Sequence, residues 1–324
     1  MIQKRKTLLG IGFLSCWLMA GASLNDNNLS QTAIAKDLPQ PPIQLAQASQ
    51  KEIVIVFASR RDASDLKTKA EAVSKILSQQ IGVPVKAVIA SESAAVEALR
   101  ANRADVAFLG GRAAIQAEKT TGAKLYLAEV RNDYSGGHTY KSVLVVRQDS
   151  PLKTLATEKQ TLGQLKGKKM AFASRTSGSG FIIPTGEFVG EGLVSDPDRY
   201  DQFFSKVIYG DGYPSALQAV LKGQADVAAV SEYALNSPWI TPEEVKKLRV
   251  LWSIPGVPAH GIAIDNDVPA PLRDKIIAAF LTLNEPKNNA LFRSLYNSTK
   301  LVKVDHDTHI APMKKALTRA KLEP

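Results

Sequence analysis

The sequence has 324 residues, of which 44% are hydrophobic and 22% charged, and its formal net charge is +10. This length is enough for two domains with sizeable cores, and the composition is that of a soluble globular protein. The basic residues are spread along the sequence without a dense block or interleaved aromatic residues, which argues against a nucleic-acid partner. A basic excess of this size is compatible with a small anionic ligand.

The first 22 residues have the features of an export signal, because a basic start is followed by an apolar run. The run is shorter than the roughly 20 residues that a membrane span requires. We therefore expect residues 1–22 to be a signal peptide, cleaved after Ala22 or alternatively after Ala35, and the protein to be periplasmic. Cys16 is the only cysteine. It lies in a poor lipobox, so a lipid anchor there is the less favoured alternative, and the cleaved protein would contain no disulfide.

Residues 23–50 show no apolar periodicity and predict a disordered leader. From Glu52 onward, short apolar runs alternate with segments of helical spacing, a pattern typical of an α/β fold with a largely parallel sheet. The expected strands are 53–57, 84–90 and 104–109, and the expected helices are 66–80 and 93–100, the second capped by Ser93.

Two short motifs recur in the same order. The residues Phe-Ala-Ser-Arg at 57–60 recur at 172–175, and Ala-Asp-Val-Ala at 104–107 recurs at 225–228. Chance recurrence is one explanation, and the other is two lobes built on one βαβ plan. Ligands of open α/β sheets bind beyond the carboxyl ends of the strands, so both Ser-Arg turns would border a shared cleft.

We expect the lobe boundaries where the strand and helix pattern of the first lobe gives way to that of the second. Residues 143–146 and 250–254 are candidate hinge strands, which makes the first lobe discontinuous. The predicted lobes are residues 51–143 plus 254–324 for the first and 147–252 for the second. Prolines at 255, 258, 269 and 271 predict a loop-rich return segment, followed by helices at 272–284 and 311–321 that cover the first lobe.

The segment 168–184, KKMAFASRTSGSGFIIP, contains the most informative turn in the chain. An apolar strand at 170–173 leads into a run of small and hydroxylated residues, and a helical pattern begins at Phe181. Such a turn is suited to an oxyanion, because unpaired N–H groups and the helix dipole provide positive potential and glycine allows close approach. The alternative is a simple helix N-cap, and the spacing is not that of a Walker loop.

The order of the motifs resembles a known family. Residues 177–184, SGSGFIIP, resemble the Ser-Thr-Ser-Gly-x-x-x-Pro signature of periplasmic phosphonate- and phosphite-binding proteins, the soluble receptors of ABC importers. Tyr140-Lys141-Ser142 resembles their Tyr-x-Ser element. Further counterparts occur in order at 104–110, 224–228 and 252–258, so that the similarity covers about residues 51–310.

The resemblance implies a type II periplasmic binding protein, with two lobes that close about a hinge onto a ligand. It also implies that the hydroxyls of Ser177 and Ser179 and the N–H groups of Gly178 and Gly180 hold an oxyanion, while Tyr140 donates across the cleft. The threonine of the signature is replaced by Gly178, for which Thr176 is a possible substitute.

The resemblance also bears on the substituent of the ligand. Acidic residues that hold an ammonium tail in some family members fall at Tyr233 and Val257 here, although a shifted register could use Glu232. A buried cation without a partner costs several kcal/mol, about 3–5. We therefore expect a small amine-free phosphorus oxyanion, namely phosphite, phosphate or methylphosphonate.

Four further residues are candidate ligand contacts. Arg60 and Arg175 follow the recurring strands and could pair with the anion. Tyr213 and His260 lie in segments that should line the cleft. His306 and His309 have a metal-like spacing, but no distant third ligand is evident, and we expect neither a metal site nor a cofactor.

The predicted function is that of a monomeric substrate-binding receptor that delivers its ligand to an ABC permease in the inner membrane. Such a receptor is not an enzyme. One alternative is a sensor subunit of the same fold. Another is a secreted phosphoester hydrolase with Ser177 or Ser179 as the nucleophile. Two observations argue against a hydrolase: no base with an orienting partner is evident, and the residues 177–180 do not have the register of Gly-x-Ser-x-Gly.

Overall fold

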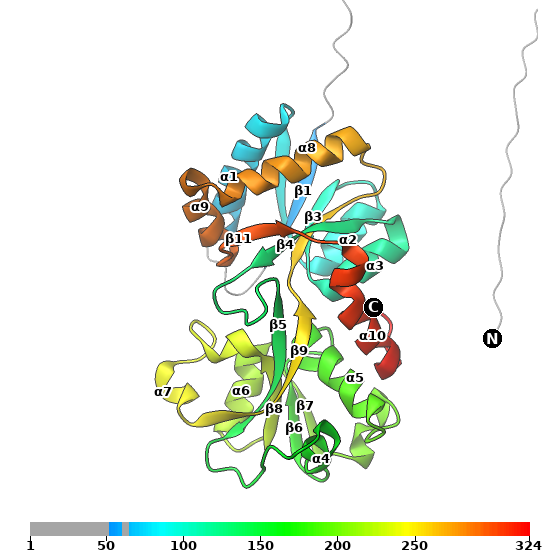
Figure 1. Cartoon of the computed structure of the whole chain (residues 1–324), viewed down its shortest axis with the longest axis vertical. Coiled ribbons are helices and arrows are strands. Elements are labelled where there is room, and N and C mark those ends of the chain that lie inside the picture. Colours follow the sequence, from blue (N-terminus) through cyan, green and yellow to red (C-terminus); the bar gives the residue numbers. More distant parts are fainter. Residues whose placement is uncertain (1–51, 60–64) are drawn as a thin grey trace, which may run out of the picture. The chain divides into compact units, whose positions relative to one another are not determined.

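The computed structural model describes residues 52–59 and 65–324, which form two sheets with helices around them (Figure 1). The predicted signal peptide, the predicted leader, Cys16 and Arg60 lie outside the described residues. Within the described ranges, no helix has the length and apolar character needed to cross a membrane.

The first sheet has the strand order β11-β4-β10-β3-β1-β2. Its members are β1 (Ile53–Ala58), β2 (Val85–Ala90), β3 (Val106–Leu109), β4 (Lys124–Val130), β10 (Gly261–Ile264) and β11 (Lys300–Lys303). β1 is parallel to β2 and β3, whereas β10 is antiparallel to β3 and β4. The parallel arrangement predicted for the first three strands is therefore confirmed.

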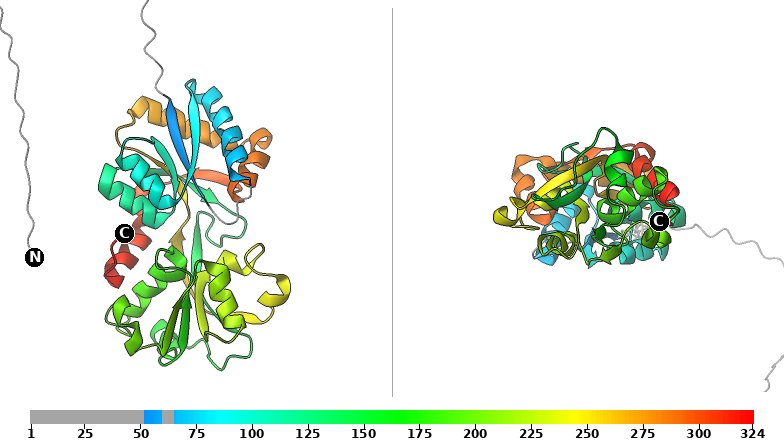
Figure 2. Two further views of the ribbon diagram at one scale, coloured as in Figure 1. Left: turned by 180° about the vertical axis from the view of Figure 1, so that it is seen from behind. Right: turned by 90° about the horizontal axis from the view of Figure 1, so that it is seen from below.

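Helices cover both faces of the first sheet (Figure 2). They are α1 (Leu66–Ile81), α2 (Glu92–Arg100), α3 (Gly111–Thr121), α8 (Ala270–Leu281) with the short η4 (Thr282–Asn284), and α9 (Pro286–Tyr296). Successive side chains of a strand point to opposite faces. Accordingly, Ile55 and Phe57 pack in the core beneath α1, α8 and α9, whereas Val56 packs in the core that contains Leu99 of α2.

The second sheet has the order β7-β6-β8-β5-β9. Its strands are β5 (Thr139–Arg147), β6 (Lys169–Phe172), β7 (Lys206–Tyr209), β8 (Val227–Ser231) and β9 (Leu248–Pro258). The helical elements are α4 (Glu158–Gly163), the π-helical turn η1 (Gly178–Ile182), α5 (Ile183–Gly190), η2 (Pro197–Gln202), α6 (Tyr213–Leu221), η3 (Glu232–Leu235) and α7 (Pro242–Val245).

The two recurring Ala-Asp-Val-Ala motifs occupy equivalent positions in the two sheets. In the first sheet, Oδ2 of Asp105 accepts the N–H of Val54 at 2.8 Å. In the second, Oδ2 of Asp226 accepts the N–H of Lys169 at 2.7 Å. In each case the aspartate directly precedes one strand, β3 or β8, and accepts an N–H at the start of the neighbouring parallel strand, β1 or β6. The recurrence therefore reflects a shared structural role.

The expected hinge strands belong entirely to the second sheet. β5 and β9 pair antiparallel from Thr139 to Arg147, with two register shifts, so residues 143–146 and 250–254 lie inside this ladder. The chain instead passes between the sheets at 131–138 and 259–260. β9 also extends through Pro255 and Pro258, where a loop was expected. β9 is the edge strand, and an edge position tolerates a missing N–H group.

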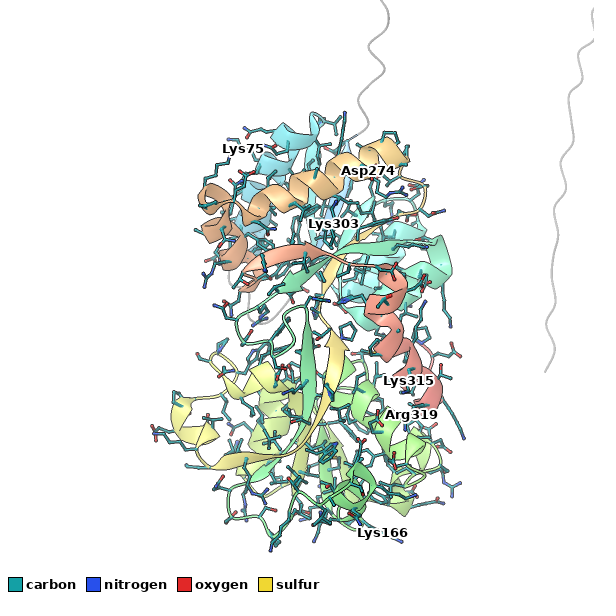
Figure 3. The ribbon with its side chains drawn as sticks, in the orientation of Figure 1. Lys75, Lys166, Asp274, Lys303, Lys315 and Arg319 are labelled. Carbon is teal, nitrogen blue, oxygen red and sulfur yellow. The ribbon has the colours of Figure 1, made fainter. Side chains whose placement is uncertain are left out.

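The C-terminal helix α10 (His306–Ala320) packs against elements that accompany both sheets, namely α3 and β4 of the first and α5 and η1 of the second. Arg319, labelled in Figure 3, pairs with Glu187 of α5 at 2.6 Å, and Lys314 pairs with Glu118 of α3 at 2.9 Å. The helix was expected to start at Ala311. It starts earlier because Asp305 caps it by accepting the N–H of Thr308 at 2.9 Å.

The other boundaries differ from the expected ones by a few residues. The largest functional consequence is at α2, which is capped by Ser91 rather than by Ser93: the Ser91 hydroxyl accepts the N–H of Ala94 at 3.2 Å. The helix therefore begins at Glu92, which lies in its first turn.

Candidate functional site

A cavity of about 220 Å³ lies between the carboxyl ends of β1 in the first sheet and β6 in the second. Its lining residues come from both halves of the chain: Ser59, Glu92, Gly110, Gly111, Arg112, Tyr140, Thr176, Ser177, Gly178, Tyr213, Pro258, His260 and Met313. Pockets for drug-sized molecules measure roughly 300–1,000 Å³, so this cavity suits a small ligand. The strand ends are also where open α/β sheets bind their ligands.

On the side of the second sheet, the turn after β6 forms the wall. Ser177 is the N-cap of η1, and its Oγ accepts the N–H of Gly180 at 3.0 Å. Thr176, Ser177 and Gly178 line the cavity. Because a helix start leaves its first N–H groups without intrahelical partners, this turn offers amide donors together with hydroxyl groups.

Ser179 and Gly180 are not among the lining residues. Ser179 is fully buried, and its hydroxyl lies 2.8 Å from the hydroxyl of Tyr213. The N–H of Gly180 is occupied by the Ser177 cap. An added Cβ at Gly180 would lie 2.5 Å from Cβ of Ala173, so only glycine fits where the turn folds back on its strand. Both residues therefore shape the turn.

The neighbouring strand β5 connects this turn to the Tyr-x-Ser element. Tyr140 lines the cavity, and the hydroxyl of Ser142 donates to the carbonyl of Ser179 at 2.6 Å. Ser142 therefore contacts η1, and Tyr140, two residues earlier on the strand, lines the cavity together with Ser177 and Gly178. Ser142 thus supports the turn, while Tyr140 faces the ligand space.

On the side of the first sheet, the cavity wall is the start of α3. Gly110, Gly111 and Arg112 line it. An added Cβ at Gly111 would lie 2.7 Å from Cγ of Pro258, so glycine allows α3 to approach the end of β9. Arg112 is half-buried, and no ion pair involving its guanidinium is found within residues 52–59 and 65–324.

Glu92 and His260 complete this wall. Oε1 of Glu92 accepts the N–H of Gly110 at 2.8 Å and lies 3.1 Å from Nε2 of His260. Nδ1 of His260 lies 3.7 Å from Oε1 of Glu129, which is fully buried and accepts the hydroxyl of Tyr134 at 2.7 Å. The imidazole therefore contacts the carboxylate on the cavity wall through Nε2, whereas its buried Nδ1 makes no hydrogen bond among the described residues.

A second compartment of about 240 Å³ adjoins the first and shares Ser177, Tyr213 and His260 with it. It is largely aromatic: the ring centroid of Tyr213 lies 5.7 Å from that of Tyr233 and 5.4 Å from that of Trp239. Its remaining lining residues are Ala173, Ser174, Asp211 and Gly212. This compartment could contain a substituent of a ligand held in the first.

Helix starts converge on the two compartments. Glu92 begins α2, Gly111 begins α3, Gly178 begins η1 and Tyr213 begins α6, and all of them line one or both compartments. Each helix start carries a partial positive charge, and charged or polar groups of a ligand would meet these dipoles together. The arrangement favours a compact anion.

Two of the sequence candidates are placed elsewhere. Arg175 lies over the ring of Tyr209 at 4.4 Å from its centroid and 3.7 Å from Asp198, in a separate pocket. Oε1 of Glu232 accepts the N–H groups of Ser135 and Lys141, and Glu232 lines neither compartment. A shifted register therefore does not bring this acid to the ligand space.

The histidines with metal-like spacing make structural contacts. Nδ1 of His306 accepts the N–H of Leu125 at 2.9 Å, which leaves its proton on Nε2, 3.4 Å from Glu118. Nε2 of His309 lies 3.0 Å from the carbonyl oxygen of Ala259. Burial lowers the pKa of both histidines below the usual value, so each is favoured in its neutral form.

The sequence analysis did not identify Glu92, Arg112, Asp211 or Trp239. A signal for Arg112 was available, because Gly110-Gly111-Arg112 places a basic residue at a helix start directly after an apolar strand. Glu92 could not be recognised while the helix cap was placed at Ser93. Asp211 precedes α6 and Trp239 follows η3 in the chain, and both line the second compartment. Tertiary packing brings them together there, so no local pattern could have identified them.

Comparisons with known proteins agree with this geometry. A family model described as "ABC transporter, phosphonate, periplasmic substrate-binding protein" matches residues 55–309. The chain is 26% identical over 253 residues to the phosphonates-binding periplasmic protein of Escherichia coli, covering 77% of this chain and 72% of that one. It is also 26% identical over 257 residues to the phosphate-import protein PhnD of Mycolicibacterium smegmatis, covering 78% and 77%.

Among solved structures, PhnD1 of Prochlorococcus marinus in complex with methylphosphonate has the same fold, with a TM-score of 0.64 and 19% identity. The match covers 84% of this chain and 99% of that one. The predicted two-sheet α/β architecture is thereby confirmed.

Proposed function

Because the chain belongs to the family of periplasmic substrate-binding proteins of phosphonate ABC transporters, we propose that it is a receptor that captures a small phosphorus oxyanion for import. The candidate ligands are phosphite, phosphate and methylphosphonate. The ligand would occupy the 220 Å³ cavity, with its oxygens toward the start of η1 and toward Arg112.

The observation that carries this proposal is the meeting of two helix starts and an arginine in one small cavity. Gly178 and Ser177 approach it from one sheet, and Gly111 and Arg112 approach it from the other. Hydrogen bonds to charged groups contribute about 1.5–3 kcal/mol each, so a few such donors are enough to hold a small anion. A ligand bound to both walls would draw the two sheets together and exclude water.

The same contacts argue against covalent chemistry. Ser177 Oγ accepts the Gly180 N–H, and Ser179 is bonded to Tyr213. Within the described part of the chain, neither hydroxyl is hydrogen-bonded to a histidine, as an activated nucleophile would be. We infer a non-catalytic, monomeric receptor that is exported by residues 1–22 and delivers its ligand to an ABC permease.

The second compartment supports an amine-free ligand. Tyr233 occupies one of the positions at which family members that take aminoalkyl ligands carry an acid, and the other, Val257, is fully buried within β9. Asp211 also lines this compartment, but it is exposed to solvent, where a carboxylate pairs only weakly with a cation. Aminoethylphosphonate should therefore bind more weakly than methylphosphonate. Equal affinities would contradict the preference for an amine-free ligand.

A thermal-shift panel with phosphite, phosphate, methylphosphonate, aminoethylphosphonate and sulfate tests the proposal. A ligand present at 100 times its Kd stabilises the folded state by about 2.7 kcal/mol, which raises the melting temperature measurably. We expect a shift with at least one of the three candidate ligands, followed by titration calorimetry to rank them. A protein that responds to none of them, or that releases phosphate from a phosphate ester, would contradict the proposal.

A further inference from the structure

One part of the cavity wall is apolar. Apart from the glycines and two further residues, every lining residue carries a hydroxyl, carboxylate, guanidinium or imidazole group; the two are Pro258 and Met313. Both pack around Gly111, where an added Cβ would lie 2.7 Å from Cγ of Pro258 and 3.6 Å from Cγ of Met313. The two apolar side chains are therefore neighbours, and neither can donate a hydrogen bond.

Met313 extends from this point to the turn on the opposite side. It is a buried residue of α10, a helix that contacts both α3 and η1. An added Cβ at Gly178 would lie 2.7 Å from Cε of Met313. Gly178 replaces the threonine of the family signature, so the methionine fills space that a threonine side chain would need. This chain thus has a thioether methyl group in place of a side chain that bears a hydroxyl.

We propose that Met313 determines the specificity of the cavity by receiving the non-oxygen substituent of the bound oxyanion. Phosphite has a hydrogen atom, and methylphosphonate a methyl group, at the position where phosphate has a further oxygen. A hydrogen atom or a methyl group loses no hydrogen bond when it is buried against the thioether, and burial of the methyl group is favourable. A phosphate oxygen placed there would lose water without gaining a donor, which is unfavourable.

The polar lining groups do not make this distinction. The guanidinium of Arg112 and the hydroxyl of Ser177 can donate to the oxygens of all three candidate ligands, so they attract each of them. Apolar pockets discriminate against an analogue that adds a hydroxyl by up to about 100-fold. The unbranched thioether chain of Met313 is flexible enough to pack against either a hydrogen atom or a methyl group. The preferred ligands are thus phosphite and methylphosphonate, and phosphate should bind more weakly.

This inference rests on the proposed function, and titration calorimetry at neutral pH tests it. The preference is the affinity for the better of phosphite and methylphosphonate divided by the affinity for phosphate, and we expect it to be at least tenfold in the unchanged protein. Met313→Gln nearly keeps the side-chain length and adds an amide donor for the further oxygen, so it should reduce the preference at least tenfold. Met313→Leu remains apolar and should retain it.

A double substitution tests the same role without a polar residue on α10. Gly178→Thr combined with Met313→Ala puts a hydroxyl-bearing side chain into the space that the thioether leaves, and it decides the question if Met313→Gln does not fold. It should also reduce the preference at least tenfold. Lys315→Gln is the control, because Lys315 is an exposed residue of the same helix, and it should leave all affinities unchanged.

The outcomes separate this inference from the receptor function. If the unchanged protein binds phosphate as tightly as the other two ligands, the role of Met313 is refuted while the receptor function stands. The same holds if the folded polar variants keep the full preference, or if Met313→Leu loses it. If the unchanged protein binds none of the three oxyanions, both proposals fail.

Discussion

The two sheets repeat one plan. Three neighbouring strands run parallel, β2-β1-β3 in the first sheet and β7-β6-β8 in the second, and an antiparallel strand follows, β10 or β5. In each sheet an aspartate accepts the N–H at the start of the middle parallel strand, Asp105 in one and Asp226 in the other. Their contributions to the cavity differ. The second sheet provides hydroxyl and amide groups around Ser177, whereas the first provides an arginine, a carboxylate and an imidazole.

This difference indicates a division of labour between two walls of similar architecture. Neutral donors on rigid turns bind any oxyanion of the right size, so the second wall should contribute most of the affinity. Ionisable groups respond to the charge and protonation of the ligand, so the first wall should contribute selectivity and a dependence on salt. The following experiments test this division.

The largest effect is expected when the hydroxyls of the second wall are removed. Ser177→Ala combined with Ser179→Ala should weaken oxyanion binding at least tenfold, by about 2–3 kcal/mol, because a direct donor and the partner of Tyr213 are lost together. Calorimetry measures the change, and Ser294→Ala on the exposed side of α9 serves as a control. An unchanged affinity would remove this turn from the site.

The aspartates that close the two sheets should differ in their contribution to stability. Asp105 is buried, so Asp105→Ala leaves the N–H of Val54 unsatisfied and should lower the free energy of unfolding by about 2 kcal/mol. Asp226 is exposed, and water can replace it, so Asp226→Ala should cost less than about 1 kcal/mol. Denaturant unfolding compares the two, and equal losses would contradict the assignment by burial.

On the first wall, Arg112→Gln should lower affinity about tenfold, or about 1.4 kcal/mol, through the loss of a charge-assisted hydrogen bond. It should also make binding less sensitive to salt, because a partly buried charge pair is removed. Arg103→Gln, at an exposed residue before β3, is the control. A variant that retains both the affinity and the salt dependence would show that Arg112 does not contact the ligand.

The smallest effect concerns pH. Burial lowers the pKa of His309 below its ordinary value of 6.5. As the pH falls below about 6.5, the unfolded chain binds a proton that the folded chain does not, so stability decreases toward acid and is unaffected above neutrality. His309→Gln should flatten the decline in melting temperature between about pH 7 and pH 5.

Lys315→Gln, at an exposed residue of the same helix, is the control for that measurement, and Figure 3 shows its position. It should leave the slope of melting temperature against pH unchanged. A slope that is equally steep in His309→Gln and in the unchanged protein would mean that other groups cause the acid sensitivity.

Local patterns in the sequence were sufficient for much of the fold. Alternating apolar runs and helical spacing predicted β1, α1, β2 and β3, and the recurring motifs predicted a second sheet of the same plan. The turn after β6 was recognised because glycines and hydroxylated residues lie between an apolar strand and a helical pattern there, and because its order of residues resembles a family signature. These features depend on neighbours within a few positions of the chain, which is why the sequence alone determined them.

Tertiary structure decided what local patterns could not. β9 continues through two prolines because it lies at a sheet edge, and Ser179 turns away from the cavity because Tyr213 takes its hydroxyl. Glu92 and His260 are 168 positions apart in the chain and meet only through the sheet. The signature and the type of fold were determined by the sequence. The wall formed by the first sheet depends on long-range packing, because its residues are far apart in the chain and no local pattern sets the distances between them.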